Sequence, residues 1–517
     1  MFIYNTIRGE IMKKICRMLF SHVTIIGFLL LLQFGFLILL VSALNYVYAE
    51  IQLVMIIIAI ITLFSIGSRD MQTEAKNSWA IIVLLAPAFG TIAYILFSKN
   101  RLTKKQIKII REVKKQSDAK INHKYELKIK EELDDNQYAQ LQYLYSANKQ
   151  IGYINSDLTF YDYGEKFYVD FIKELKEAKN FIFLEYFIIA PGKMLDGVVD
   201  ILLEKVQKGV EVRFIYDDVG SASTIHSSFA RALQKKGIKC YPYNRLRIFL
   251  SSIYNNRDHR KIAVIDGKVA FTGGLNLADE YINQLNRFGI WKDTAIKIKG
   301  EAVDSMTAMF LSNYAINLRK EEDFSKYLHH YTKTKKNGVI VPYGDGPKPF
   351  YNEYVGENVF LNMINGAVKY VYITTPYLIC DNKLLDALKN AAMRGVDVRI
   401  VLPHIPDKKI VFMLSRSNYR KLINHGVHIY EFKDGFMHAK ELIADDKQAI
   451  VGTINFDYRS LIHHFENGVL MFNVDILEDI KEDFNRIFAQ SINMRDFKQN
   501  RLTRLFCSLL DIFRPLL

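Results

Sequence analysis

The chain repeats one pattern after about 180 residues, and this repeat constrains its fold more than any other feature of the sequence. The stretch HRKIAVIDGKVAFTGGLN (259–276) is matched by HAKELIADDKQAIVGTIN (438–455), with identical spacing of His, Lys, Asp, Gly and Asn. One such His-x-Lys pair would more often be an ordinary pair on an exposed strand, but two matched copies argue against that interpretation. A period this long is too large for a solenoid and predicts two duplicated units.

Three further pairs of segments extend the repeat on the N-terminal side of these stretches. They are 178–189 with 367–379, 208–217 with 394–403, and 235–244 with 424–433. In each unit, predicted strands alternate with predicted helices, which indicates an α/β fold with a largely parallel or mixed sheet. We therefore expect two α/β units in a pseudo-twofold arrangement, at residues 149–335 and 336–498.

The two matched stretches are predicted to be strands that end in hairpin turns. Residues i and i+2 of a strand point to the same side, so His259 and Lys261 should share one face. Asp-Gly favours a hairpin turn, which places Asp266 at the turn. Asn276 follows the return strand, directly before a predicted helix at 277–285. The second copy repeats this layout with His438, Lys440, Asp445 and Asn455.

These residue types suit chemistry at a phosphate group. A histidine can act as a nucleophile or as a general acid near neutral pH. Lysine and asparagine donate hydrogen bonds that stabilise a tetrahedral oxyanion. If the pseudo-twofold brings both sets together, four donors hold one phosphate between two histidines, one attacking phosphorus and the other protonating the leaving oxygen. We predict no metal and no other cofactor, because no Asp, Glu and His cluster has the spacing of a two-metal site.

The N-terminal part of the sequence predicts a membrane anchor with transmembrane helices over residues 1–98. Between residues 23 and 67 the only charged residue is Glu50, and this run is about twice the ~20 residues that one helix needs to cross a bilayer. We expect it to form a helical hairpin with two crossings. A further apolar segment at 79–97 is interrupted by Pro87 and Gly90, so it could be a third span, a kinked helix or a re-entrant segment, and we favour a shallow or re-entrant one.

Basic residues are concentrated beside this anchor. Residues 99–130 contain twelve Lys or Arg against three acidic residues, a local net charge of +9. Such a cluster indicates the cytoplasmic side and attraction to anionic lipid headgroups, although a solvated helix without a partner has the same composition. We expect 99–148 to be a basic juxtamembrane linker. The tail at 499–517 has apolar and basic residues on opposite sides of a helix, so it either lies among headgroups or packs on the protein body.

The two signatures resemble those of the phospholipase D superfamily, His-x-Lys-x4-Asp followed by Gly-x-x-Asn, and the chain is most similar to bacterial cardiolipin synthases. The superfamily resemblance covers about 150–490. The apolar pattern of Trp79, Pro87, Phe89, Gly90 and Tyr94 is similar to the membrane segment that precedes it in those synthases. The resemblance implies one active site between the units, formed by His259, Lys261, Asn276, His438, Lys440 and Asn455.

The resemblance also implies residues that support this site. Family members place a carboxylate behind each histidine, and Asp293 in WKDT and Glu466 in HHFENG stand where that partner is expected. Either acid could instead be a surface or helix-capping carboxylate. Asp266 and Asp445 complete the signature and are counted with the catalytic residues, although their position at hairpin turns favours a structural role.

The activity implied by the resemblance is cardiolipin synthesis in the bacterial cell membrane. One phosphatidylglycerol would give its phosphatidyl group to another through a phosphohistidine intermediate, releasing glycerol. Phosphatidylglycerol and other anionic lipids are then the expected partners, and the catalytic region lies on the cytoplasmic side of a multi-pass anchor. A membrane-bound phospholipase D remains an alternative, because transfer and hydrolysis share their first step. A nuclease is disfavoured, and nucleic acid is not an expected partner, because the basic residues cluster beside the anchor.

Overall fold

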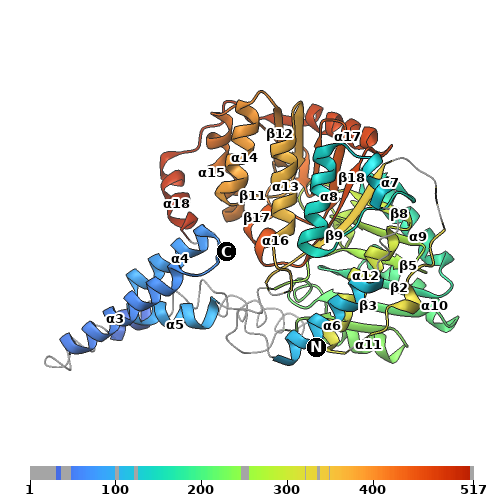
Figure 1. The fold of residues 1–517 in the computed structure, drawn as a ribbon, viewed down its shortest axis with the longest axis horizontal. Helices are drawn as coiled ribbons and strands as arrows, with labels where there is room; N and C mark the ends of the chain where they lie inside the picture. The colour runs from blue at the N-terminus through green and yellow to red at the C-terminus, as the bar shows by residue number, and fades with distance from the viewer. Residues whose placement is uncertain are drawn as a thin grey trace. The chain divides into compact units, whose positions relative to one another are not determined.

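The computed structural model describes residues 31–36, 48–98, 104–120, 126–245, 256–320, 322–332, 334, 338–348 and 350–512. The chain divides into two compact units (Figure 1). One comprises residues 1–101, 247–255 and 500–517, and we call it the apolar unit. The other, which we call the α/β body, comprises residues 102–246 and 256–499.

The apolar unit contains the helices α3 (Tyr48–Gly67), α4 (Thr73–Leu85) and α5 (Pro87–Phe97). Within the described chain, α3 is the one helix that is long and apolar enough to cross a membrane. The predicted interruption at Pro87 is confirmed, because α4 ends before it and α5 begins at this proline, a position where its missing N–H costs nothing. Most of the first half of the predicted hairpin lies outside the described residues, so two crossings stay a prediction.

The C-terminal helix α18 (Arg501–Asp511) also belongs to the apolar unit. Ser78 Oγ of α4 donates a hydrogen bond to the carbonyl of Ile512 at 2.5 Å, and Cys507 of α18 is buried. The opposite side of the helix exposes the leucines Leu502, Leu505 and Leu509. The tail therefore contacts the anchor and leaves an apolar side uncovered.

The α/β body contains two mixed sheets. The first is formed by β1 (Ser156–Tyr161), β2 (Phe181–Tyr186), β3 (Glu211–Asp217), β4 (Lys239–Tyr243), β5 (Ile262–Ile265), β6 (Val269–Gly273) and β8 (Ala295–Gly300). The second is formed by β9 (Val339–Asp345), β10 (Tyr370–Thr374), β12 (Asp397–Pro403), β13 (His428–Phe432), β15 (Glu441–Ala444), β16 (Gln448–Gly452), β18 (Glu466–Phe472) and β19 (Ser491–Asn493).

The strand order of the two sheets is the same. It is β1-β8-β6-β5-β2-β3-β4 in the first and β9-β18-β16-β15-β10-β12-β13 in the second, with β19 added at the edge. In both, the three strands at one end run parallel and the remaining neighbours of the shared order pair antiparallel. This correspondence confirms the prediction of two duplicated α/β units, and we call them the first and second repeat units.

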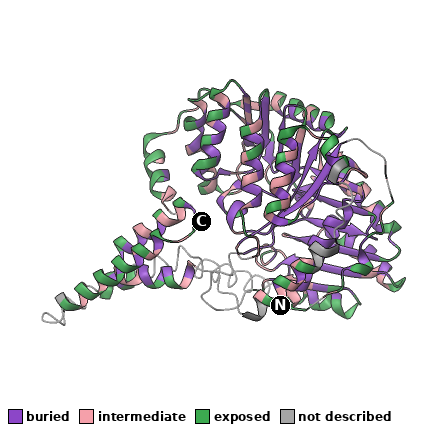
Figure 2. Ribbon diagram, viewed as in Figure 1, coloured by how far each residue is buried: buried purple, intermediate pink, exposed green. Residues whose placement is uncertain are grey.

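Helices cover the sheets, and the two repeat units share a hydrophobic core. The covering helices include α9 (Gly164–Glu177), α10 (Lys193–Gln207) and α12 (Val303–Leu318) in the first unit, and α13 (Val355–Gly366), α14 (Asn382–Met393), α15 (Lys409–Ile423) and α17 (Leu477–Ala489) in the second. Figure 2 shows the central strands as buried, and their apolar runs fit strands that are covered on both faces. Phe310 of α12 stacks on Phe183 of β2 at 4.7 Å, and this core continues to Val451 of the second sheet.

The helices of the basic segment belong to the α/β body. They are α6 (Lys104–Lys120), α7 (Glu126–Glu131) and α8 (Asp135–Asn148). Gln137 of α8 donates hydrogen bonds to the carbonyl of Lys447 and to Asn473, while Val113 of α6 is buried in the shared core. The few apolar and amide side chains between the lysines make these contacts.

Both signature hairpins form as predicted, and their aspartates fasten them to the sheet. The turn residues have positive φ, 54° and 64° at Asp266 and Gly267, as two-residue hairpin turns require. The carboxylate of Asp266 accepts three backbone N–H hydrogen bonds at 2.7–2.8 Å, from Lys179, Asn180 and Phe181. Asp445 does the same at 2.7–2.9 Å with Val368, Lys369 and Tyr370. These contacts support the structural role that their position at the hairpin turns favours.

Asp266→Ala is therefore expected to lower stability and to leave the chemistry intact. The change removes the acceptor of three backbone N–H groups, so we expect the free energy of unfolding to fall by about 2–4 kcal/mol. Thermal denaturation of the purified protein would measure this as a lower Tm, compared with Asp386→Ala on the surface of α14. Activity per folded molecule should stay within about threefold of wild type, and a loss of a hundredfold or more would restore a catalytic role.

Candidate active site

The histidines and lysines of both signatures lie just before strands, not on them as predicted. β5 begins at Ile262 and β15 at Glu441. The residues before each strand form backbone hydrogen bonds with the other repeat unit. The N–H of His259 donates to the carbonyl of Phe465 at 2.9 Å, and the N–H of His438 donates to the carbonyl of Lys292 at 2.8 Å. The strands β7 (Ile290–Lys292) and β14 (Gly435–Met437) form a parallel pair at the second of these crossings.

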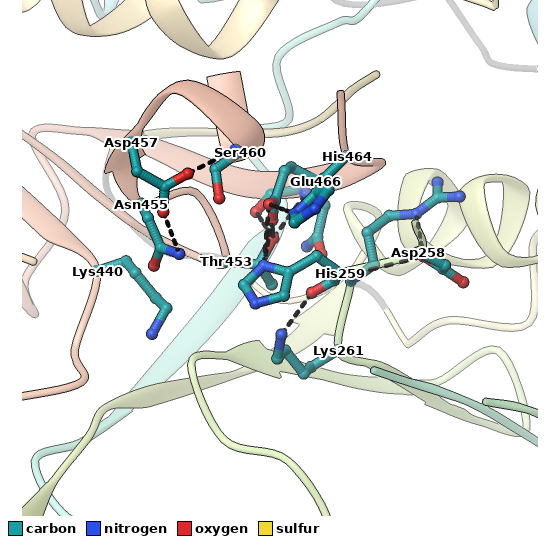
Figure 3. Close-up of polar contacts among 12 residues, drawn as sticks. Asp258, His259, Lys261, Lys440, Thr453, Asn455, Asp457, Ser460, His464 and Glu466 are labelled. Atoms are coloured by element: carbon teal, nitrogen blue, oxygen red, sulfur yellow. Dashed lines mark hydrogen bonds and ion pairs between the residues drawn. The ribbon is translucent and has the colours of Figure 1, made fainter. Parts of the chain in front are cut away.

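Each histidine is held by a carboxylate of the other repeat unit. Nδ1 of His259 lies 2.9 Å from Glu466, and Nδ1 of His438 lies 2.6 Å from Asp293. Both carboxylates are completely buried, and the first pair is visible in Figure 3. The structure thus brings together the histidines and the two acids that the sequence analysis assigned to them. The crossing between units had no signal in the sequence.

The two lysines lie at the same place and are also buried. Nζ of Lys261 donates to the carbonyl of His259 at 2.5 Å, and Nζ of Lys440 lies 2.9 Å from Nδ1 of His438. Burial lowers the pKa of Lys261 to about 7 and that of Lys440 to about 8, against the attraction of both site carboxylates. Since each lysine interacts with Glu466 and with Asp293, the two half-sites form one electrostatic unit.

Burial and the nearby lysines favour the neutral form of both histidines by lowering their pKa values. Burial, followed by repulsion from Lys440, lowers the pKa of His438 to about 4. Burial and the two lysines lower the pKa of His259 well below its usual value. A neutral imidazole suits a nucleophile, whereas a general acid needs a proton. An anionic phosphodiester between the lysines would offset their charge and favour protonation of one ring.

The two asparagines have fixed orientations beside these groups. Oδ1 of Asn276 accepts a hydrogen bond from the N–H of Ile188 at 2.9 Å, and its Nδ2 donates to the hydroxyl of Tyr281 at 2.6 Å. Nδ2 of Asn455 donates to Asp457 at 2.9 Å. An amide nitrogen carries two N–H donors, so each asparagine retains one besides the donor used here. The predicted helix after Asn276 is only a short 3₁₀ helix, Asp279–Ile282.

The two carboxylates are accommodated differently. A Cβ added at Gly274 would lie 1.9 Å from Oδ1 of Asp293, so only glycine leaves room for this carboxylate. The equivalent position in the second repeat unit is Thr453, whose hydroxyl donates to Glu466 at 2.5 Å. The difference between Gly-Gly-Leu-Asn and Gly-Thr-Ile-Asn was the sequence signal for this asymmetry.

A buried charge cluster lies behind His259. Arg260 lies 2.9 Å from Glu185 and 3.3 Å from Asp258. Asn313 of α12 donates hydrogen bonds to both carboxylates at 3.0 and 2.7 Å. Burial raises the pKa of Glu185 well above its usual value. This cluster anchors the connection that carries His259.

Comparisons with known proteins agree with this arrangement. A family profile described as "Cardiolipin synthase, PLD-like domain" matches residues 171–310 and 360–488, one stretch in each repeat unit. A profile described as "Phospholipase_D-nuclease N-terminal" matches residues 54–99.

Relatives of similar length were found among curated proteins. An uncharacterized protein of Streptococcus mutans is 43% identical, covering 87% of this chain and 98% of the relative. A cardiolipin synthase of Geobacillus sp. is 33% identical, covering 88% and 91%. The crystal structure of phosphatidylserine synthase from Haemophilus influenzae aligns with a TM-score of 0.57 at 14% identity, over 74% of this chain and 100% of that one, and this likeness concerns the fold alone.

Proposed function

This chain belongs to the cardiolipin synthase family of phospholipase D-like proteins and is a phosphatidyltransferase, and we propose that it joins two phosphatidylglycerol molecules into cardiolipin and glycerol. The observation that carries the proposal is the crossed pairing of His259 with Glu466 and of His438 with Asp293. Because each pair joins the two repeat units, both histidines belong to one site, which suits a reaction at a single phosphate.

In the proposed first step, Nε2 of one histidine attacks phosphorus of the first phosphatidylglycerol. The carboxylate accepts a hydrogen bond from the Nδ1–H of that ring. This keeps the proton on Nδ1 and leaves the lone pair of Nε2 free. A P–N bond forms, the P–O bond to glycerol breaks, and the second histidine gives its Nε2 proton to the leaving oxygen. Lys261 and Lys440 stabilise the charge on the non-bridging oxygens, with the free N–H groups of Asn276 and Asn455.

In the second step, the acceptor hydroxyl of another phosphatidylglycerol attacks the phosphohistidine. The second histidine, now neutral, takes the proton of this hydroxyl, while the P–N bond breaks and releases the first ring. Both histidines return to their starting forms, so the cycle consumes no cofactor. Water in the acceptor's place would give phosphatidic acid, which is the reaction of the alternative phospholipase D.

The apolar unit supports lipid as the acceptor. Its helix α3 exposes apolar side chains along most of its length, among them Leu53, Ile57, Ile61 and Phe64. An anchor of this kind would hold the site at the surface where the second lipid is concentrated. The basic helix α6 supports a position of the α/β body on the cytoplasmic side of the bacterial membrane.

The purified full chain in vesicles that contain phosphatidylglycerol should release glycerol and form cardiolipin in equal amounts. We expect phosphatidic acid to be a minor product, because the membrane-bound acceptor competes with water. Lipid extraction with mass spectrometry and an enzymatic glycerol assay would measure all three products, with phosphatidylcholine vesicles as the control. If phosphatidic acid dominates in intact vesicles, the phospholipase D alternative is correct.

A further inference from the structure

A third histidine, His464, lies beside the pair formed by His259 and Glu466. Its ring centroid is 5.5 Å from that of His259, and its Nδ1 is 3.5 Å from Oε1 of Glu466 (Figure 3). His464 is only 9% exposed, and the same Oε1 of Glu466 also lies 2.9 Å from Nδ1 of His259, so this oxygen faces both rings. One nitrogen of each ring and one carboxylate oxygen lie within 4.8 Å of one another.

We propose that His259, His464 and Glu466 form a binding site for a transition-metal dication, with Zn²⁺ as the best fit, and that its occupation inhibits the enzyme. Two imidazoles and one carboxylate are a donor set that Zn²⁺ prefers over Mg²⁺. Tetrahedral coordination with bonds of about 2.0–2.1 Å places neighbouring donor atoms about 3.3–3.5 Å apart. The separation of 3.5 Å between His464 and Glu466 fits this value, and the pair at 2.9 Å must widen slightly.

The ligand atoms are available near neutral pH. A neutral imidazole has one ring nitrogen with a lone pair, and this is the form of histidine that binds a metal. Lys261 and Lys440 oppose a cation at this place. The carboxylate of Glu466 counters their charge as a ligand.

Metal binding at Nδ1 would disable His259 through its tautomer. In the proposed cycle, Nδ1 of His259 carries a proton and donates a hydrogen bond to Glu466. Nε2 then has the lone pair that is needed to attack phosphorus or to take up a proton. When Nδ1 coordinates the metal, the neutral ring keeps its single proton on Nε2. The proton moves from one ring nitrogen to the other, and no lone pair faces the phosphate.

Among the described residues, this donor set is found in one of the two half-sites. Trp291 occupies the position equivalent to His464, two residues before the carboxylate in each repeat unit. Its ring centroid lies 5.1 Å from that of His438. The indole N–H is a donor without a lone pair, so the pair of His438 and Asp293 has no third ligand from this position.

The first experiment compares inhibition of wild type with that of His464→Asn and His464→Gln. Initial rates in phosphatidylglycerol vesicles are measured over buffered free Zn²⁺, each against the same variant's rate in chelator. We expect wild type to lose at least tenfold activity at a free Zn²⁺ concentration that changes the variants by less than twofold. Mg²⁺ at equal concentration should not inhibit. Equal inhibition of all three proteins would overturn the proposal.

The second experiment measures Zn²⁺ binding and does not measure activity, so it tests this inference separately from the proposed function. The inference rests on the proposed function only in the rate assay of the first experiment. Equilibrium dialysis of the full chain in detergent with Zn²⁺, followed by metal analysis, should give one more Zn²⁺ per wild-type chain than per His464→Asn chain. Asp293→Asn, in the other half-site, should keep the wild-type stoichiometry. Equal stoichiometry in wild type and His464→Asn contradicts the site, whereas absent lipid transfer with this difference preserved contradicts only the proposed function.

Discussion

Replacing either His259 or His438 with alanine is expected to reduce phosphatidyl transfer at least about 10³-fold. One histidine forms the bond to phosphorus and the other handles the proton of the leaving and entering oxygens, so each loss stops the same cycle. Groups that act as a unit lose activity in a non-additive way. The double variant should therefore be no more than a few-fold worse than the poorer single variant.

Glycerol release from phosphatidylglycerol vesicles measures these rates. His425→Ala is the matched control, because this exposed histidine lies in the turn after α15, where its Nδ1 contacts the carbonyl of Lys421. Lipid labelled in the phosphatidyl group also separates the two roles, since only a variant that retains the nucleophile can become labelled through an acid-labile bond. A single variant with more than a tenth of wild-type activity would rule out paired roles.

Asp293→Asn and Glu466→Gln should each lower the rate by about 10²–10⁴-fold, although both preserve side-chain size. An amide that donates its N–H to Nδ1 forces the histidine proton onto Nε2, which is the wrong tautomer for attack or proton uptake. An amide also cannot stabilise an imidazolium as a carboxylate does. Because the pairs cross, Asp293→Asn in the first repeat unit disables His438 in the second.

Asp386→Asn provides the control for these two variants, since it neutralises an acid on the surface of α14 that contacts only Lys389. Circular dichroism and thermal denaturation should show that all three proteins are folded. Activity of Asp293→Asn or Glu466→Gln within about fivefold of wild type would mean that these carboxylates only fill space.

The sequence predicted the parts of the fold that local patterns determine. Alternating strands and helices indicated two α/β units, and Asp-Gly indicated the first hairpin turn. The extent of the strands was wrong at His259 and His438, because their backbone N–H groups bond to the opposite repeat unit. Strand propensity in HRKIAVID could not reveal a partner about 200 residues away in the chain.

Long-range contacts also explain the other differences. The contacts of α8 depend on isolated residues such as Gln137, while the surrounding lysines dominated the composition and indicated a linker. Asp293 and Glu466 were assigned through resemblance, but nothing in their spacing showed which histidine each would meet. His464 went unnoticed because it belongs to neither signature and becomes meaningful only through its distance to Glu466.

The crossed pairs of histidine and carboxylate bear on the ancestry of the chain. Neither repeat unit alone contains a complete pair, so an ancestor with one unit could have worked only as a symmetric homodimer, each copy lending its acid to the other. If the two units arose by duplication and fusion, that requirement of symmetry was removed and equivalent positions could diverge. Gly274 opposite Thr453, and Trp291 opposite His464, are traces of this freedom, and half-chains expressed together should regain activity that neither has alone.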